Sequence, residues 1–70
     1  MGEVARSIGI RLRAAREAKG LSQTQVGAPY FTRAYVSAVV LGKTSPAIKS
    51  LVHFARKLDM QVCDLIPDDL

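Results

Sequence analysis

Apolar residues recur at helical spacing from the start of the chain. Ile8, Leu12 and Ala15 are three or four positions apart, and most of the charged residues of this stretch lie between them. Gly20 follows this pattern, and glycine is the residue that most often ends a helix. We therefore expect a helix over residues 4–19.

A second, shorter helix is predicted by a local capping pattern. Ser22 is followed three residues later by Gln25, a spacing at which each side chain can accept a hydrogen bond from the other residue's backbone N–H. Pro29 disfavours helical geometry in the residue before it. The helix should therefore span about two turns, over residues 22–28.

The valine-rich segment 32–41 fits a helix better than a strand. In a strand, neither of the two alternating faces would separate polar from apolar side chains. In a helix, one face carries the valines Val36, Val39 and Val40. The opposite face carries Arg33, Ala34, Ser37 and Ala38. Thr32 can cap such a helix and Gly42 can end it.

Two further helices are expected in the second half of the chain. Ser45 followed by Pro46 is typical of a helix start, with serine as the N-cap and proline at the first helical position. A helix over 46–58 is supported by an apolar stripe of Ile48, Leu51, Val52, Ala55 and Leu58. A short fifth helix over 62–66 is expected to hold Val62, Leu65 and Ile66.

Length and composition favour one compact domain, residues 1–70, of the all-α class with five helices. The 70 residues are 49% hydrophobic, which is enough for one small core. The single cysteine permits no intrachain disulfide, which fits a reducing compartment. No apolar run reaches the roughly 20 residues of a membrane helix, and the first residues lack the apolar core of a signal peptide. We expect a cytoplasmic protein without a membrane segment.

The reactive side chains argue against catalysis and metal binding. The chain has one histidine, His53, and one cysteine, Cys63, whereas a structural metal site uses about four ligands at short spacings. There is no glycine-rich phosphate loop, and so small a chain has little room for a substrate cleft. We expect that the protein is not an enzyme and that it binds no metal, cofactor or small-molecule ligand.

Positive charge is concentrated in the N-terminal part of the chain. Residues 1–43 contain seven Lys and Arg against two Glu, a net charge of +5, whereas residues 44–70 have a net charge of −1. A basic front half favours a polyanionic partner such as nucleic acid. Together, the short helix 22–28, a tight turn and the helix 32–41 form the plan of a helix-turn-helix.

From these segments outward, the chain resembles a known family. The stretches IGIRLRAAREAKGLSQTQV and YVSAVVLGKTSPAIKSLVHFARKLDMQVCDLI are similar to the Cro/C1-type (XRE-like) helix-turn-helix domains of phage and bacterial repressors. The shared pattern is Arg-Glu-x-x-Gly, then Leu-Ser-Gln, then a Tyr-Val-Ser recognition helix. Gly-Lys follows, and then a proline before an amphipathic helix. The order and spacing of these short motifs carry the resemblance, which covers residues 8–66.

The resemblance implies a lambda-repressor-like domain that binds double-stranded DNA sequence-specifically as a transcriptional regulator, with the helix 32–41 in the major groove. The implied base contacts are Arg33, Ala34, Ser37 and Ala38. Arg33 suits guanine, because a guanidinium can donate two hydrogen bonds to O6 and N7. The implied phosphate contacts are Gln23, Thr32, Tyr35, Lys43, Thr44 and Ser45. The resemblance further implies a homodimer on a pseudo-palindromic operator, and we expect its dimer surface at Leu65, Ile66 and Leu70.

The chain departs from the family pattern at three places. Val40 stands where the family often has a glutamate that pairs with an arginine matching Arg16, so Arg16 needs another partner or must extend to solvent. Residues 28–31 replace the family's glycine turn between its second and third helices. Asp59 replaces the usual glycine after the fourth helix, and aspartate tolerates the left-handed backbone region better than most residues.

Alternatives remain for the aromatic residues and for the function. Tyr35 either faces DNA or forms a half-buried edge of the core. Tyr30 and Phe31 are expected to pack the corner rather than to stack on single-stranded bases. The rival function is a helical protein–protein interaction module, for example one that binds an antitoxin-like partner. It would hold that partner with the apolar face of the third helix, through Tyr35, Ala38 and Leu41.

Overall fold

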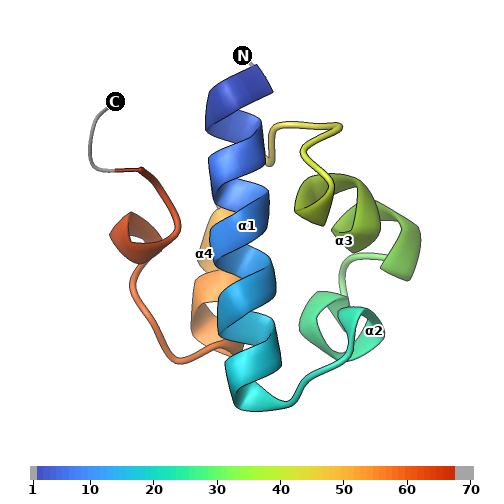
Figure 1. Cartoon of the computed structure of the whole chain (residues 1–70). Helices are drawn as coiled ribbons and strands as arrows, with labels where there is room; N and C mark the ends of the chain where they lie inside the picture. Colours follow the sequence, from blue (N-terminus) through green and yellow to red (C-terminus); the bar gives the residue numbers. More distant parts are fainter. Residues whose placement is uncertain (1, 68–70) are drawn as a thin grey trace.

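Four α-helices and one short 3-10 helix make up the regular structure of residues 2–67, the part of the chain that this computed structural model describes. They are α1 (Gly2–Lys19), α2 (Gln23–Gly27), α3 (Arg33–Val40), α4 (Ile48–Lys57) and the 3-10 helix η1 (Val62–Asp64). The long α1 stands in the middle, with α2 and α3 on one side of it, α4 behind it and the C-terminal segment on the other side (Figure 1). None of the helices within this range is long and apolar enough to cross a membrane.

All four α-helices and the segment after η1 contribute to one buried core. The side chains that are fully excluded from solvent are Leu12, Val26, Val36, Val39, Phe54 and Leu65. They come from α1, α2, α3, α4 and the segment after η1. Burying a side chain of this size contributes roughly 1.5–3 kcal/mol, so each helix is held chiefly by its contact with the same core.

The local signals for the starts of both helices of the helix-turn-helix are confirmed. The Ser22 hydroxyl accepts from the backbone N–H of Gln25 at 3.0 Å, and the Gln25 side chain accepts from the N–H of Ser22 at 2.8 Å. The Thr32 hydroxyl accepts from the N–H of Tyr35 at 3.1 Å. In the expected ranges 22–28 and 32–41, the outermost residues are therefore the caps of α2 and α3.

The start of α4 differs from the expected range 46–58. Ala47 is the residue before the helix, with an extended backbone (φ −69°, ψ 162°) and no side-chain cap. Pro46 therefore precedes the helix, since its fixed φ suits an extended backbone as well as a first helical turn. Ile48 takes the first helical position and is 71% exposed, so its expected place in the buried stripe is wrong.

The expected fifth helix over 62–66 is wrong as well, because only the three residues of η1 form a turn there. The Asp64 carboxylate accepts from the backbone N–H of Gln61 at 3.0 Å and closes this single turn. Leu65 then enters the core with 0% exposure, so it cannot form the expected dimer surface. Ile66 is half-buried, and Leu70 lies outside the described residues.

Two of the three departures from the family pattern are resolved locally. Asp59 adopts the left-handed region with φ 55°, as expected. Arg16 finds another partner: its Nη1 donates to the Leu21 carbonyl at 2.8 Å, and its Nη2 lies 3.8 Å from Glu17 Oε2. Arg16 thereby joins the end of α1 to the segment that leads into α2.

Candidate nucleic-acid interface

The third helix divides sharply between a buried and an open face. Val36 and Val39 are fully buried, and Val40 is partly buried against the same core. On the other side, Arg33 and Ala34 are exposed. The valine-rich segment is therefore a helix, as expected, and Arg33 and Ala34 on the face opposite the valines are left free.

Two glycines allow α3 to lie close to its neighbours. A Cβ on Gly9 of α1 would clash with the carbonyl oxygen of Val40 and would lie 2.6 Å from that of Val39. A Cβ on Gly27 of α2 would lie 2.9 Å from a methyl group of Val36. Real Cβ atoms do not approach so closely, so the position of α3 against α1 and α2 depends on the absence of these two side chains.

Tyr35 lies at the edge of the core rather than on the open face. Its hydroxyl donates to Ser50 Oγ at 2.9 Å, and its ring stacks on Phe31 with centroids 5.2 Å apart. Ser50 is only 2% exposed and is a buried polar residue of α4. The half-buried alternative for Tyr35 is the one that the structure shows, and this bond joins α3 to α4.

The loop after α3 has a defined conformation. The N–H of Gly42 donates to the Val39 carbonyl at 3.0 Å and the N–H of Lys43 donates to the Ala38 carbonyl at 2.9 Å. With Gly42 at φ +73°, these two bonds form a Schellman motif. The expected helix stop at Gly42 is confirmed, and the direction in which the chain leaves α3 at Lys43 is set by it.

The remaining candidate residues lie on α3, on either side of it in the chain and at the start of α2. Lys43, Ser45 and Thr32 are exposed. Thr44 and Gln23 are half-buried, as are Ser37 and Ala38 on α3 itself. The Thr32 hydroxyl accepts the capping bond of α3, and its own hydrogen is left to donate outward.

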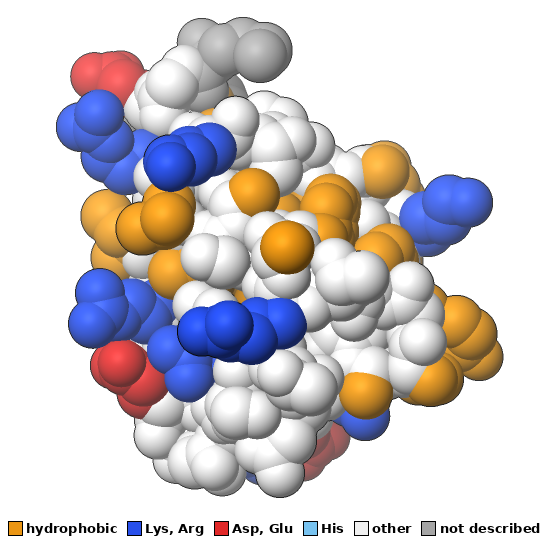
Figure 2. All heavy atoms as spheres, turned by 90° about the vertical axis from the view of Figure 1, so that its right-hand side faces the viewer, with side chains coloured by type: hydrophobic (Ala, Val, Ile, Leu, Met, Phe, Trp, Pro, Cys, Tyr) orange, Lys and Arg blue, Asp and Glu red, His pale blue; other side chains and the backbone are white. Residues whose placement is uncertain are grey.

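The face around α3 is basic but not uniformly so. Figure 2 shows separate Lys and Arg side chains across this face, with acidic side chains towards its margins and apolar side chains between the basic ones. Arg33 is in the first turn of α3 and Lys43 follows its end. Such an arrangement can bind a phosphate backbone at several points while a helix with small side chains approaches closely.

Several structural residues of this site were missed at the sequence level. Gly9 falls in an ordinary helical pattern, and its contact with α3 is visible only once the two helices are placed. Ser50 lies outside the expected apolar stripe of its helix, so its burial and its bond to Tyr35 are visible only in the fold. His53 Nε2 lies 3.1 Å from the Val26 carbonyl and joins α4 to α2. Within residues 2–67, no three His, Cys, Asp or Glu side chains are grouped as a metal site would require.

A solved structure of similar sequence matches this arrangement. The restriction-modification controller protein C.AhdI from Aeromonas hydrophila is 32% identical, with a TM-score of 0.82, over 87% of this chain and 94% of that one. At this identity and coverage, the shared fold reflects a shared family. The chain belongs to the Cro/C1-type (XRE-like) helix-turn-helix family.

Other solved structures extend the comparison for this Cro/C1-type domain. The DNA-binding domain of BldD is 26% identical with a TM-score of 0.84, over 96% of this chain and 99% of that one. PlcR of Bacillus thuringiensis, solved with the peptide PapR7 and DNA, shares the fold at 23% identity and a TM-score of 0.82. This match covers 86% of the Cro/C1-type domain but only 21% of PlcR. No family model and no curated relative matches the sequence.

Proposed function

We propose that this domain is a transcriptional regulator that binds double-stranded DNA sequence-specifically and places α3 in the major groove. The observation that carries the proposal is the division of α3, whose valines are buried while Arg33 and Ala34 are open to a ligand. The proposal is a binding role and contains no catalytic step. It is supported by the family and by relatives described as a controller protein and a DNA-binding domain.

In this proposal, base and phosphate contacts come from different parts of the site. Arg33 reads guanine, and the small Ala34, Ser37 and Ala38 allow the helix to approach the base edges. Gln23, Thr32, Lys43, Thr44 and Ser45 contact phosphates on either side. Tyr35 positions α3 through its bond to Ser50, since its hydroxyl is directed into the protein.

The proposal includes a homodimer on a pseudo-palindromic site. A single short recognition helix contacts few base pairs, so two-fold pairing with half-sites about 34–36 Å apart would provide affinity and specificity. Because Leu65 is buried in the core, it does not contribute to the contact between the two copies.

Selection from a random duplex library at two salt concentrations tests the function. We expect one enriched sequence motif at both concentrations, with total binding much weaker at the higher salt because phosphate contacts release counterions. Binding that yields no motif would contradict sequence-specific recognition. Binding that does not change with salt would contradict the phosphate contacts.

The rival interaction through the apolar face of α3 has less surface available than the sequence indicated. Val36 and Val39 are in the core, and the ring and hydroxyl of Tyr35 are engaged with Phe31 and Ser50. Leu41 alone among these residues is a large apolar side chain with high exposure, at 61%. No observation on α3 favours a protein partner over DNA.

A further inference from the structure

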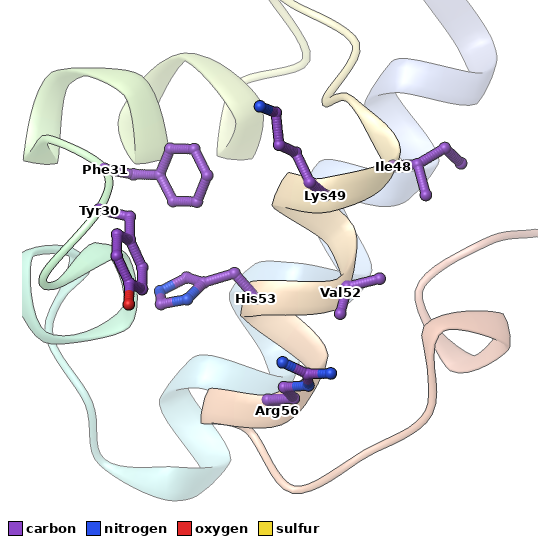
Figure 3. Close-up of a pocket in the computed structure, with 7 residues that line it drawn as sticks. All are labelled: Tyr30, Phe31, Ile48, Lys49, Val52, His53 and Arg56. Carbon is purple, nitrogen blue, oxygen red and sulfur yellow. The ribbon is translucent and has the colours of Figure 1, made fainter.

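An open apolar hollow lies between α4 and the corner that joins α2 to α3. Its apolar walls are Tyr30 and Phe31 from the corner and Ile48 and Val52 from α4 (Figure 3). The hollow has a volume of about 740 Å³. Tyr30 is 78% exposed and Ile48 is 71% exposed, although both are large side chains that are usually covered. Phe31 packs against the core as expected, whereas Tyr30 is largely exposed and contacts the ring of His53.

The aromatic side of this hollow is held in place by the protein itself. His53 lies edge-on to Tyr30, with ring centroids 5.5 Å apart, and its Nε2 lies 3.1 Å from the Val26 carbonyl. Phe31 contacts the rings of Tyr35 and Phe54 at 5.2 and 5.7 Å. A wall packed in this way is preformed, so a ligand would not have to order it.

Two cations mark the ends of the hollow. Lys49 and Arg56 are exposed and extend from opposite ends of α4 in Figure 3. They are seven residues apart on one helix, which separates them by about 10 Å along its axis. Within residues 2–67, neither forms an ion pair, and the side chains lining the hollow include no acid.

We propose that this surface binds an acidic segment of another protein, which inserts one apolar side chain between Tyr30 and α4 and directs carboxylates at Lys49 and Arg56. Exposed tyrosine and arginine beside an apolar hollow are the residues that most often dominate binding energy at protein interfaces. Carboxylates on both sides of the anchor would match the two cations, because opposite charges across an interface favour the correct partner.

Other occupants fit the same surface less well. A second copy of this chain, paired by a two-fold axis, would bring Lys49 and Arg56 towards the same basic surface of its partner. Nucleic acid would pair with the cations but leave Ile48 and Val52 without an apolar partner. A small molecule in the hollow would leave much of Tyr30 and Ile48 exposed, because both side chains stand so far out of the surface.

A peptide-display selection tests the proposal. Random 16-residue peptides are selected on the folded domain and counter-selected on the double variant Tyr30→Ser/Ile48→Ser, whose positions are exposed enough to preserve folding. We expect the enriched sequences to combine Asp or Glu with Leu, Ile, Phe or Trp. As synthetic peptides, they should bind the double variant and Arg56→Glu at least about tenfold more weakly than the wild type. Arg13→Glu, the same charge change on α1, should bind them as the wild type does.

Three results would overturn the proposal. The first is enrichment of peptides without acidic residues, or of peptides that bind the double variant equally well. The second is that no peptide is enriched. If the domain then self-associates in sedimentation experiments and the double variant does not, a second copy of the chain is the occupant. The third is loss of duplex binding in the double variant, which assigns the surface to nucleic acid. The proposed function does not depend on Tyr30 or Ile48. If the peptide experiment fails while the wild type still binds duplex DNA, only the proposal for this surface is overturned.

Discussion

Arg33 is the residue from which base preference is expected to come. It is exposed in the first turn of α3, and no ion pair within residues 2–67 involves it. Arg33→Ala should reduce the preference for one base pair by roughly 1–3 kcal/mol and leave most non-specific binding, because only the bidentate base contact is lost. Competition binding with duplexes substituted at each position measures this change. Arg13→Ala removes an exposed arginine that pairs with Glu17 on α1 and serves as the control. An equal loss for every duplex would instead show that Arg33 contacts phosphate.

Gly9 is expected to contribute to stability because it has no side chain. Glycine to alanine in a helix is ordinarily stabilising by up to about 1 kcal/mol, but here the added Cβ would meet two backbone carbonyls of α3. Gly9→Ala should therefore lower the free energy of unfolding by roughly 1–3 kcal/mol, since backbone cannot move aside as a side chain can. Thermal unfolding followed by circular dichroism measures the change. Gly2→Ala adds the same methyl group to the same helix with nothing within 4 Å. It should be neutral or slightly stabilising, and equal effects at both positions would contradict the close contact.

At the scale of the element, the role of the loop after α3 can be tested by substituting two glycines that share a backbone conformation. Gly20 has φ +70° and open space around it, whereas Gly42 has φ +73° and lies 3.0 Å, measured from an ideal Cβ, from Arg6 Cα. Alanine at either position incurs the left-handed backbone penalty of about 1 kcal/mol. Only Gly42→Ala should also shift the loop Lys43–Ser45 against α1 and weaken duplex binding. Urea unfolding and duplex titration of both variants separate the two effects. If Gly20→Ala and Gly42→Ala weaken duplex binding equally, the shift of the loop has no effect on binding and the loop contributes no contact.

The elements themselves were predictable wherever a local signal sets them. Ser22 with Gln25 and Thr32 with the N–H of Tyr35 are capping interactions within three residues of sequence, so they can be recognised before the fold is known. The start of α4 was not predictable in this way, because Ser45 and Pro46 suit either a helix start or an extended crossing. Only the path from α3 to α4 decides between them. The prediction of a fifth helix was wrong for a related reason, since a single turn is enough to bury Leu65.

Contacts between elements explain the rest of what the sequence left open. The inward valines of α3 followed from its own periodicity, and so did the exposure of Arg33. The hydrogen bond from Tyr35 to Ser50, the approach of Gly9 to α3 and the exposure of Ile48 and Tyr30 depend on how distant segments meet. The sequence therefore indicated which face of α3 is free, but not how α3 is held or which other surface is left uncovered.

At the scale of the whole molecule, the net charge of +4 draws any polyanion, so the total effect of salt cannot by itself locate the bound phosphates. The slope of log affinity against log salt can, because each phosphate contact adds about 0.9 to its magnitude. Lys43→Ala should reduce this slope by about one and weaken all duplexes alike. Lys57→Ala removes the same charge from the last turn of α4, at the opposite end of that helix from the loop. About 13 Å along the helix axis separates that turn from the start of α4, more than the Debye length of about 10 Å at 0.1 M salt. The salt slope of Lys57→Ala should therefore stay at the wild-type value. If both variants lower the slope equally, the whole basic surface attracts DNA without the loop contact that the proposed function requires.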